Sequence, residues 1–468
     1  MPRAKLPSRF LFGRLAAVVG PAALALLGML AVLQAGNGDE RDSPAEAAAP
    51  GSDAVVNAAA PDEEPLRYDV EYPSIGYSST APRDRVADLT ARIASGATQL
   101  AFHPVRGYLD SLLAELAIDP ASQVLVFSQT SLQSRRIRPE TPRAIYFNDS
   151  VYVAWVQNGP LEIASLDPAL GPVFYLLEQE PQARPAFDRE FTRCLSCHDS
   201  YSLTGGGVPR LIVGSGYTGP GGNLITHEGW ILVTDRTPLK SRWGGWYVTG
   251  RHGDQVHLGN MVIRSFDEFE RLDALRIGNI QTLDHLFDTG PYLRNTSDVV
   301  ALMVLEHQAY VQNLITRLSY DARQALHEVG ESSAARDVVR ARIAEAVEDL
   351  ARAMLFAGEV TLSAPLEGDP AFAAQFQSRA IRDGQGRSLR DFDMRRRMFR
   401  YPLSYLVYSP EFDALPEIAR QAVYERFAAV LSGADTSETF AHLTAADRAA
   451  VREIVAATKP DLAAMLAD

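Results

Sequence analysis

The sequence predicts an α+β protein, in which a strand-rich central region is followed by a helical C-terminal region. Between about residues 123 and 265, β-branched and aromatic runs alternate with Gly, Pro, Asn and Asp, the pattern of strands and turns. After residue 266 apolar residues recur every three to four positions, as on one face of a helix. Because 468 residues exceed one usual core, we expect two folded domains, a mixed domain over 67–265 and a helical domain over 266–468.

The chain begins with a predicted membrane segment, residues 1–34. Four basic residues precede an uncharged run from Leu15 to Leu33, which as a helix would span about 28 Å, close to the hydrocarbon thickness of a bilayer. Basic residues before such a segment keep the N-terminus cytoplasmic, so we expect an inner-membrane anchor with the rest of the protein facing the periplasm. The alternative is a cleaved signal peptide and release into the periplasm, although the best cleavage site, after Ala35, has Leu33 at position −3.

Residues 35–66 are predicted to be a disordered tether. This stretch consists mainly of Ala, Pro, Gly and acidic residues and contains a single Arg. It cannot bury enough apolar surface to fold. Anchor and tether together predict a folded body held near a membrane.

The central region begins with two predicted helices, one from Val86 to Ile93 and one over 108–118. Eight strands are predicted after them, at 123–128, 144–148, 151–156, 173–178, 210–216, 229–235, 243–250 and 260–265.

In the C-terminal region the helical pattern covers 299–318, 338–356, 417–431 and 445–456. Ser297 and Thr444 stand where N-caps are expected. A basic and then aromatic segment, 386–409, interrupts the helical pattern.

Composition excludes some functions. A hydrophobic share of 46% with 22% charged residues is ordinary for a folded protein, and the net charge of −13 disfavours nucleic acid as a partner. The sequence contains no phosphate-binding glycine loop and no nucleophile elbow, so it offers no support for nucleotide or acyl-transfer chemistry.

The segment RCLSCHDS, residues 193–200, holds both cysteines of the chain and His198 directly after the second. Three devices use Cys-x-x-Cys: a redox disulfide, half of a zinc site, and covalent haem attachment. A zinc site would need two more ligands from scattered histidines, and a redox dithiol is usually found in a βαβ unit that the surrounding strands do not suggest. In Cys-x-x-Cys-His, each thiol can add to a haem vinyl group while the adjacent imidazole reaches the iron.

At CLSCH the sequence resembles the c-type cytochromes, for which this is the haem-attachment signature. The resemblance implies one covalently bound haem c, attached through Cys194 and Cys197, with His198 as the proximal iron ligand. In that family the thioether bonds form outside the cytoplasm, in agreement with the predicted export. A proline about a dozen residues after the haem histidine often offers its carbonyl to the imidazole, and Pro209 stands eleven residues after His198.

The distal iron ligand is sought in GRHGDQVHLGNM, residues 250–261. We rank His257 first, His252 second and Met261 third. Met261 follows His198 by 63 positions, a separation that small cytochromes also use. Because strands rather than helices are predicted in this interval, we do not expect the small all-α cytochrome c fold. The runs WGGWYVTG and FRYPLSYLVYS are similar to those of large bacterial proteins with a cytochrome c domain, a resemblance that implies no defined activity.

The sequence therefore predicts a membrane-tethered, extracytoplasmic mono-haem c-type cytochrome in electron transfer, with a redox protein as partner. The arginines of 386–409 suit an acidic partner or the haem propionates, because Arg binds carboxylates bidentately. The alternative is a haem-c enzyme or sensor with an open distal position that binds a small substrate or gas. Whether the protein is an enzyme stays undecided, since no acid-base set is visible in the sequence.

Overall fold

The structure, a computed structural model, describes residues 69–271, 278–330 and 332–466. The described residues belong to one compact unit. The predicted anchor and tether, 1–34 and 35–66, lie outside the described residues. Within the described ranges, no helix has both the length and the apolar content needed to cross a bilayer.

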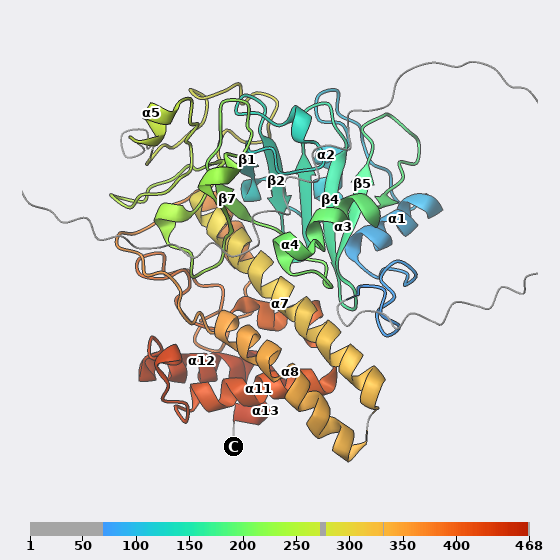
Figure 1. The fold of residues 1–468 in the computed structure, drawn as a ribbon, viewed down its shortest axis with the longest axis vertical. Coiled ribbons are helices and arrows are strands. Elements are labelled where there is room, and N and C mark those ends of the chain that lie inside the picture. Colours follow the sequence, from blue (N-terminus) through green and yellow to red (C-terminus); the bar gives the residue numbers. More distant parts are fainter. Residues whose placement is uncertain (1–68, 272–277, 331, 467–468) are drawn as a thin grey trace, which may run out of the picture. The chain divides into compact units, whose positions relative to one another are not determined.

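The α+β class is confirmed, and the fold is not a small all-α fold (Figure 1). Seven strands form an antiparallel sheet in the order β6-β5-β4-β3-β2-β1-β9, and β7 pairs with β8 in a separate ribbon. The strands are β1 (Val124–Val126), β2 (Arg143–Phe147), β3 (Val151–Trp155), β4 (Leu161–Asp167), β5 (Gly171–Leu177), β6 (Asp188–Arg189), β7 (Gly214–Gly216), β8 (Trp230–Leu232) and β9 (Trp246–Tyr247).

Seven of the eight predicted strands contain an observed strand, but the strand predicted over 260–265 is wrong. There the chain turns at Asn260, which has a φ of 66°, and hydrogen bonds such as Ile263 N–H to the Thr218 carbonyl hold it without a strand ladder. Met261 and Ile263 are nevertheless buried. Their apolar character serves packing in a loop rather than strand pairing.

The strands alternate their side chains between two hydrophobic clusters, one on each face of the sheet. Val153 and Ile163 are register partners on one face and pack in the cluster that contains α1 and α2. Tyr152 and Ala164 are partners on the opposite face and pack in the cluster that contains α7. The sheet is therefore covered on both faces.

The helices flank the sheet in the first part of the chain and fill the C-terminal part (Figure 1). They are α1 (Arg85–Ser95), α2 (Leu109–Glu115), α3 (Thr192–His198), α4 (Tyr201–Thr204), α5 (Phe266–Phe269), α7 (Val299–Val329), α8 (Ser333–Met354), α9 (Pro370–Ser378), α10 (Pro410–Asp413), α11 (Glu417–Leu431), α12 (Ala445–Thr458) and α13 (Pro460–Leu466).

Helix α7 begins at Val299 as predicted, but its N-cap is one residue later than expected. Asp298, not Ser297, is the N-cap, and its carboxylate accepts from Ala301 N–H at 2.8 Å. The Ser297 hydroxyl is used by the sheet instead, because it accepts from Leu125 N–H and donates to the Tyr247 carbonyl. The sequence predicted a capping residue at this point, but long-range hydrogen bonds of Ser297 determine that Asp298 is the cap.

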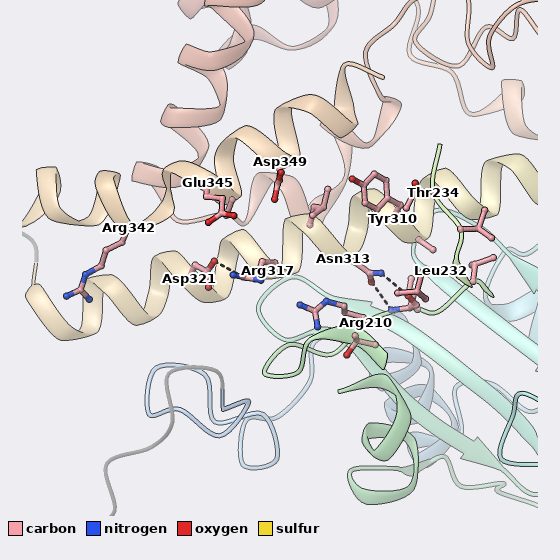
Figure 2. Close-up of a pocket in the computed structure, with 17 residues that line it drawn as sticks. Arg210, Leu232, Thr234, Tyr310, Asn313, Arg317, Asp321, Arg342, Glu345 and Asp349 are labelled. Atoms are coloured by element: carbon pink, nitrogen blue, oxygen red, sulfur yellow. Dashed lines mark hydrogen bonds and ion pairs between the residues drawn. The ribbon is translucent and has the colours of Figure 1, made fainter. Parts of the chain in front are cut away.

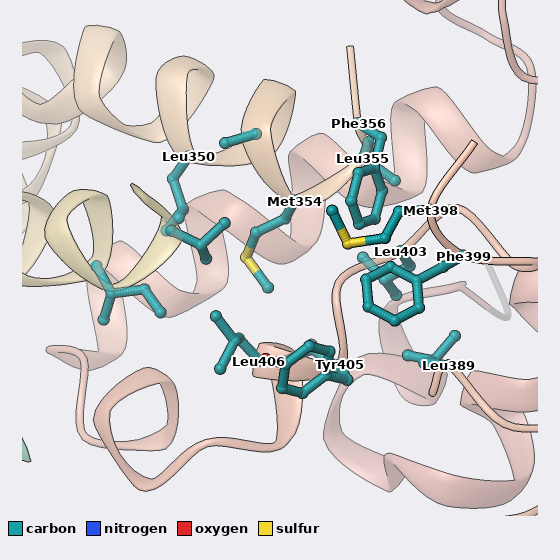
Figure 3. Packing of buried hydrophobic residues seen from close by; sticks show 14 of the residues in the cluster. Leu350, Met354, Leu355, Phe356, Leu389, Met398, Phe399, Leu403, Tyr405 and Leu406 are labelled. Carbon is teal, nitrogen blue, oxygen red and sulfur yellow. The ribbon is translucent and has the colours of Figure 1, made fainter. Parts of the chain in front are cut away.

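Helices α7 and α8 form the centre of the larger hydrophobic cluster (Figure 3). Met354 of α8, Phe399, and Tyr405 at the start of a short 3-10 helix pack in it, and so does Val126 of the sheet. The regions that the sequence separates at residue 265 therefore share one core.

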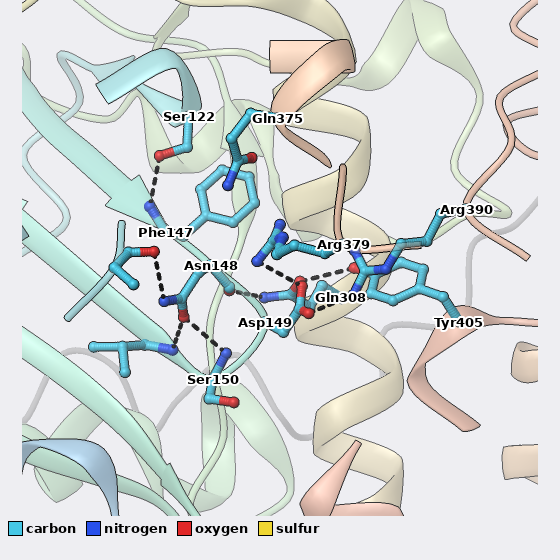
Figure 4. Close-up of polar contacts among 12 residues, drawn as sticks. Ser122, Phe147, Asn148, Asp149, Ser150, Gln308, Gln375, Arg379, Arg390 and Tyr405 are labelled. Atoms are coloured by element: carbon cyan, nitrogen blue, oxygen red, sulfur yellow. Dashed lines mark hydrogen bonds and ion pairs between the residues drawn. The ribbon is translucent and has the colours of Figure 1, made fainter. Parts of the chain in front are cut away.

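A second link between the two regions is polar (Figure 4). Asp149, in the turn after β2, pairs with Arg379 at 3.2 Å and also with Arg390. The Arg390 guanidinium lies over the rings of Tyr405 and Phe376, at 4.2 and 4.6 Å from their centroids. Part of the basic segment 386–409 is thus internal structure rather than open surface.

Candidate haem-attachment site

The predicted attachment residues lie on a short surface helix. Helix α3 contains Cys194, Cys197 and His198, and a second short helix, α4, follows it. Three glycines then reverse the chain, with φ values of 85°, 66° and 72° at Gly205, Gly206 and Gly207. Only glycine adopts three such left-handed positions without a steric cost. The turn brings residues 208–211 back beside α3.

His198 is held at one ring nitrogen only. Its Nδ1 lies 2.6 Å from the Arg210 carbonyl oxygen, while Arg210 N–H donates to the His198 carbonyl at 2.9 Å. Since a carbonyl can only accept, Nδ1 carries the proton and Nε2 carries the lone pair. Nε2 makes no hydrogen bond to any residue that the structure describes. An imidazole oriented through Nδ1–H and open at Nε2 is the form that binds a metal.

The neighbouring carbonyl is not the one that the sequence suggested. Arg210, the residue after Pro209, provides the acceptor. Pro209 instead ends the glycine turn. A backbone carbonyl does accept from the imidazole, as predicted, but it belongs to Arg210 and not to Pro209.

The imidazole of His198 is half-buried and neutral. Burial lowers its pKa, and the hydrogen bond to the Arg210 carbonyl opposes this effect only in part. The Phe174 ring of β5 lies 4.4 Å away between centroids. A neutral ring packed on an aromatic side chain suits iron ligation, because a protonated imidazole has no lone pair to donate.

Both thiols are free, with Cys194 half-buried and Cys197 exposed. Burial raises the pKa of Cys194 to about 12, with a further contribution from the carboxylates of Glu162 and Glu190. A redox dithiol uses a thiol whose pKa is lowered, and the pKa of Cys194 moves in the opposite direction. The environment of Cys194 favours the protonated thiol over the thiolate.

The surroundings of the motif are apolar and exposed. Neither α3 nor α4 has a buried residue. Phe191 precedes α3, and Tyr201 and Leu203 lie on α4; all three are exposed apolar side chains, and Tyr201 is 78% exposed. Such a group of exposed apolar side chains marks a surface that an apolar partner or ligand covers. The residues present therefore fit a haem, which would contribute a large apolar face beside both thiols and His198 Nε2.

One ion pair near the motif was missed by the sequence analysis. Arg143 of β2 and Glu162 of β4 pair at 3.0 Å, and Ser131 donates to Glu162 at 2.9 Å. Both charges contribute to the pKa of His198, in opposite directions. The signal that could have found Glu162 is the alternation of LEIASLD, which marks β4 as a strand with its polar residue on the face toward α3.

A cavity of about 290 Å³ adjoins the motif (Figure 2). Thr204 of α4, Arg210 and Leu211 line it on one side, and α7 and α8 line it on the other. Asn313 of α7 ties the two sides together, because its amide bonds both the N–H and the carbonyl of Leu211. The histidine clamp and the cavity therefore share residue 210.

The candidate distal ligands lie in a different environment. His252, His257 and Met261 are all buried. His257 Nδ1 accepts from Gly259 N–H at 2.9 Å, and its Nε2 lies 3.2 Å from His252 Nε2. The His257 ring also packs edge-on against Trp243, and Asn279 N–H donates to His252 Nε2. The two histidine rings contact each other, and the distal assignment stays a prediction.

A third group of polar residues lies inside the core. His307 of α7 bonds Asp235 through Nδ1 at 2.9 Å and Ser404 through Nε2 at 2.8 Å. Asp235, His307 and Ser404 are thus linked in the same order as the acid, base and nucleophile of a catalytic triad. All three residues are buried, however, and none lines the cavity. Among the described residues, no group of three or more His, Cys, Asp and Glu side chains is placed to hold a metal ion.

Comparison with known proteins gives no family assignment: no protein family, no curated protein and no solved structure matches this chain.

Proposed function

We propose that this protein is a mono-haem c-type cytochrome that transfers electrons. Cys194 and Cys197 would form thioether bonds to the haem vinyl groups, and His198 Nε2 would bind the iron. The bound haem would supply a one-electron change of iron valence. The observation that carries the proposal is the His198 clamp: a Cys-x-x-Cys-His helix in which Nδ1–H is fixed by a carbonyl and Nε2 is left open.

In this proposal the residues of the chain orient the haem ligand and adjust the electrostatics at the iron, and they take no part in a chemical reaction. The Arg210 carbonyl makes the imidazole a better donor by accepting its Nδ1 proton. The Phe174 ring packs against the imidazole, which would restrict the rotation of that ring and cover one side of it. The Arg143–Glu162 pair places one charge of each sign nearby, so the electrostatic balance at the iron would respond to the loss of either.

The proposal extends to the place of the protein in the cell. The uncharged run 15–33 after four basic residues supports a segment inserted in the inner membrane, and the acidic stretch 35–66 supports a tether on the periplasmic side. Haem attachment outside the cytoplasm is consistent with this orientation. An electron-transfer protein held in this way would exchange electrons with a redox protein at the same membrane.

A second candidate function is a haem-c enzyme or sensor with an open distal position. The observation that favours it is the mutual pairing of His252 and His257, which occupies His257 at both ring nitrogens. To bind iron, His257 would have to give up the Gly259 or the His252 contact.

The test is an optical and electron paramagnetic resonance spectrum of the full chain, made in a host that matures haem c. We expect a covalent haem adduct and a low-spin, six-coordinate spectrum that carbon monoxide does not change. A high-spin spectrum that shifts with carbon monoxide would favour the second candidate. A colourless protein without the adduct, after competent maturation, would overturn both.

A further inference from the structure

We propose that the cavity between α7, α8 and residues 210–213 binds the carboxylate of a small monocarboxylate, held by Arg210 and Arg317 (Figure 2). Both arginines line the cavity, one from the loop after the glycine turn and one from α7. The cavity volume of about 290 Å³ is at the lower end of the range for small-molecule pockets, which suits a ligand of a few heavy atoms.

The Arg210 guanidinium has N–H donors that make no hydrogen bond within the described residues. It donates only through Nη1, to the carbonyls of Gly206 and Val208, at 3.3 and 3.4 Å. Among the described residues, no carboxylate lies within ion-pair distance of it. A guanidinium presents five N–H donors in a planar fork that matches a carboxylate, so Nε and Nη2 remain available for a bidentate ligand.

Arg317 adds a second positive charge at the same end. Its Nε donates to Asp321 at 2.7 Å, and Asp321 also lines the cavity. The charge of Arg317 disfavours the charged form of Arg210, so the two guanidiniums repel each other. A ligand carboxylate between them would relieve this repulsion, because an opposite charge placed between two like charges lowers their electrostatic energy.

The other walls restrict the ligand. Leu211, Val213 and Leu232 make part of the lining apolar, which suits a short alkyl chain. Glu345 and Asp349 of α8 stand on the opposite side, and neither forms an ion pair within the described residues. They would repel a second carboxylate, so we expect monocarboxylates to bind better than dicarboxylates.

Two sources of such a carboxylate are compatible with the site. One is a free monocarboxylate from solution. The other is a propionate side chain of the haem, a reading that rests on the proposed function. Arg210 connects the two sites in either case, since its carbonyl holds His198 while its guanidinium faces the cavity.

The experiment is a calorimetric titration of the full chain with butyrate. Butyramide, of the same shape but without charge, and succinate serve as comparison probes. The titration is run on the haem-loaded protein and on the haem-free Cys194→Ala/Cys197→Ala variant. We expect butyrate to bind the haem-free variant, and to bind about tenfold or more weakly after Arg210→Gln or Arg317→Gln, each of which removes a charged hydrogen bond. Arg395→Gln, at an exposed arginine outside the cavity, is the matched control and should leave binding unchanged.

The outcomes separate the two sources. If the natural occupant is a free molecule, haem-loaded and haem-free protein bind butyrate alike. If it is a haem propionate, the loaded protein does not bind butyrate and the haem-free variant does. Butyrate binding no tighter than butyramide, or binding that Arg210→Gln and Arg395→Gln affect equally, would overturn the proposal. A chain that attaches no haem but binds butyrate would refute the proposed function and leave this site standing.

Discussion

Two histidines of this protein lie on helices of opposite character. His307 is on α7, where 21 of 31 residues are buried, and both its ring nitrogens are bonded within the protein. His198 is on α3, which has no buried residue, and only one of its ring nitrogens is bonded. The buried histidine has its partners inside the protein. The half-buried one, His198, keeps an electron pair available at Nε2.

The difference separates structural from functional polar groups. A buried group whose bonds are complete contributes to folding, and its loss leaves partners unsatisfied. A group that is oriented at one atom and open at another contributes little to folding, and its loss is felt by a ligand. The comparison therefore predicts different phenotypes for mutations in the two regions.

The largest expected effect is on haem attachment. Cys194→Ala with Cys197→Ala should abolish the covalent adduct, because no thiol remains to form a thioether bond. Denaturing mass spectrometry of the matured protein measures it. Since neither cysteine is buried, urea unfolding of this variant should match that of the haem-free parent within about 0.5 kcal/mol. If the haem adduct persists after the double substitution, α3 is not the attachment site.

The next effect is on the stability of the core. His307→Ala should lower the free energy of unfolding by about 3–5 kcal/mol, because it opens a cavity and leaves Asp235 buried without its partner. His198→Ala in the haem-free protein is the matched variant and should cost about 1 kcal/mol, the worth of one hydrogen bond. Urea titrations of both compare the two regions directly. Equal losses of unfolding free energy in the two variants would show that the two histidines do not differ in their contribution to folding.

Arg390 tests where the basic segment belongs. Arg390→Ala should destabilise the protein by about 2–4 kcal/mol, because it leaves Asp149 with one cationic partner fewer and removes the stacking on Tyr405. Arg395→Ala, at an exposed neighbour, should change stability by less than about 0.5 kcal/mol. If the two variants unfold alike, Arg390 does not contribute to the core, and the basic segment is an open surface.

The smallest expected effect is on pH dependence. Burial raises the pKa of Glu411 from a usual value of 4.5 to about 7. The native state then holds this proton more tightly than the unfolded chain, so its contribution to stability is full below pH 4.5 and is lost as the pH rises to 7.

Glu411→Gln carries no such proton. The loss of stability between pH 5 and pH 8 should therefore be smaller in the variant than in the parent by about 1–3 kcal/mol. Urea unfolding at both pH values measures the difference, with Glu438→Gln, a substitution at an exposed carboxylate, as the control. An unchanged pH slope would show that Glu411 ionises normally despite its burial.

Local signals predicted the parts of the fold that depend on near neighbours. Helix α11 has the predicted ends, and Thr444 caps α12 with a capping box as expected. Strand β4 was not predicted, although its alternation was visible. The strand expected over 260–265 failed because apolar residues in a packed loop resemble those of a strand.

Long-range partners account for the other differences. Ser297 was available as a cap, but its hydroxyl bonds β1 and β9 instead. The arginines of 386–409 were expected to bind an acidic partner or the haem propionates, but Arg390 pairs with Asp149, 241 positions earlier in the chain. No pattern within a few residues of either side chain contains this information.

The sequence alone determined the chemistry that contiguous residues can perform: two thiols three positions apart and an imidazole beside them, on a chain with an uncharged N-terminal run. Tertiary structure decided which atoms of that chemistry are free. The glycine turn brought the Arg210 carbonyl to His198 Nδ1, and packing joined His257 to His252. The reason is that covalent spacing is set along the chain, whereas hydrogen-bond partners and burial are set by residues that meet only when the chain folds.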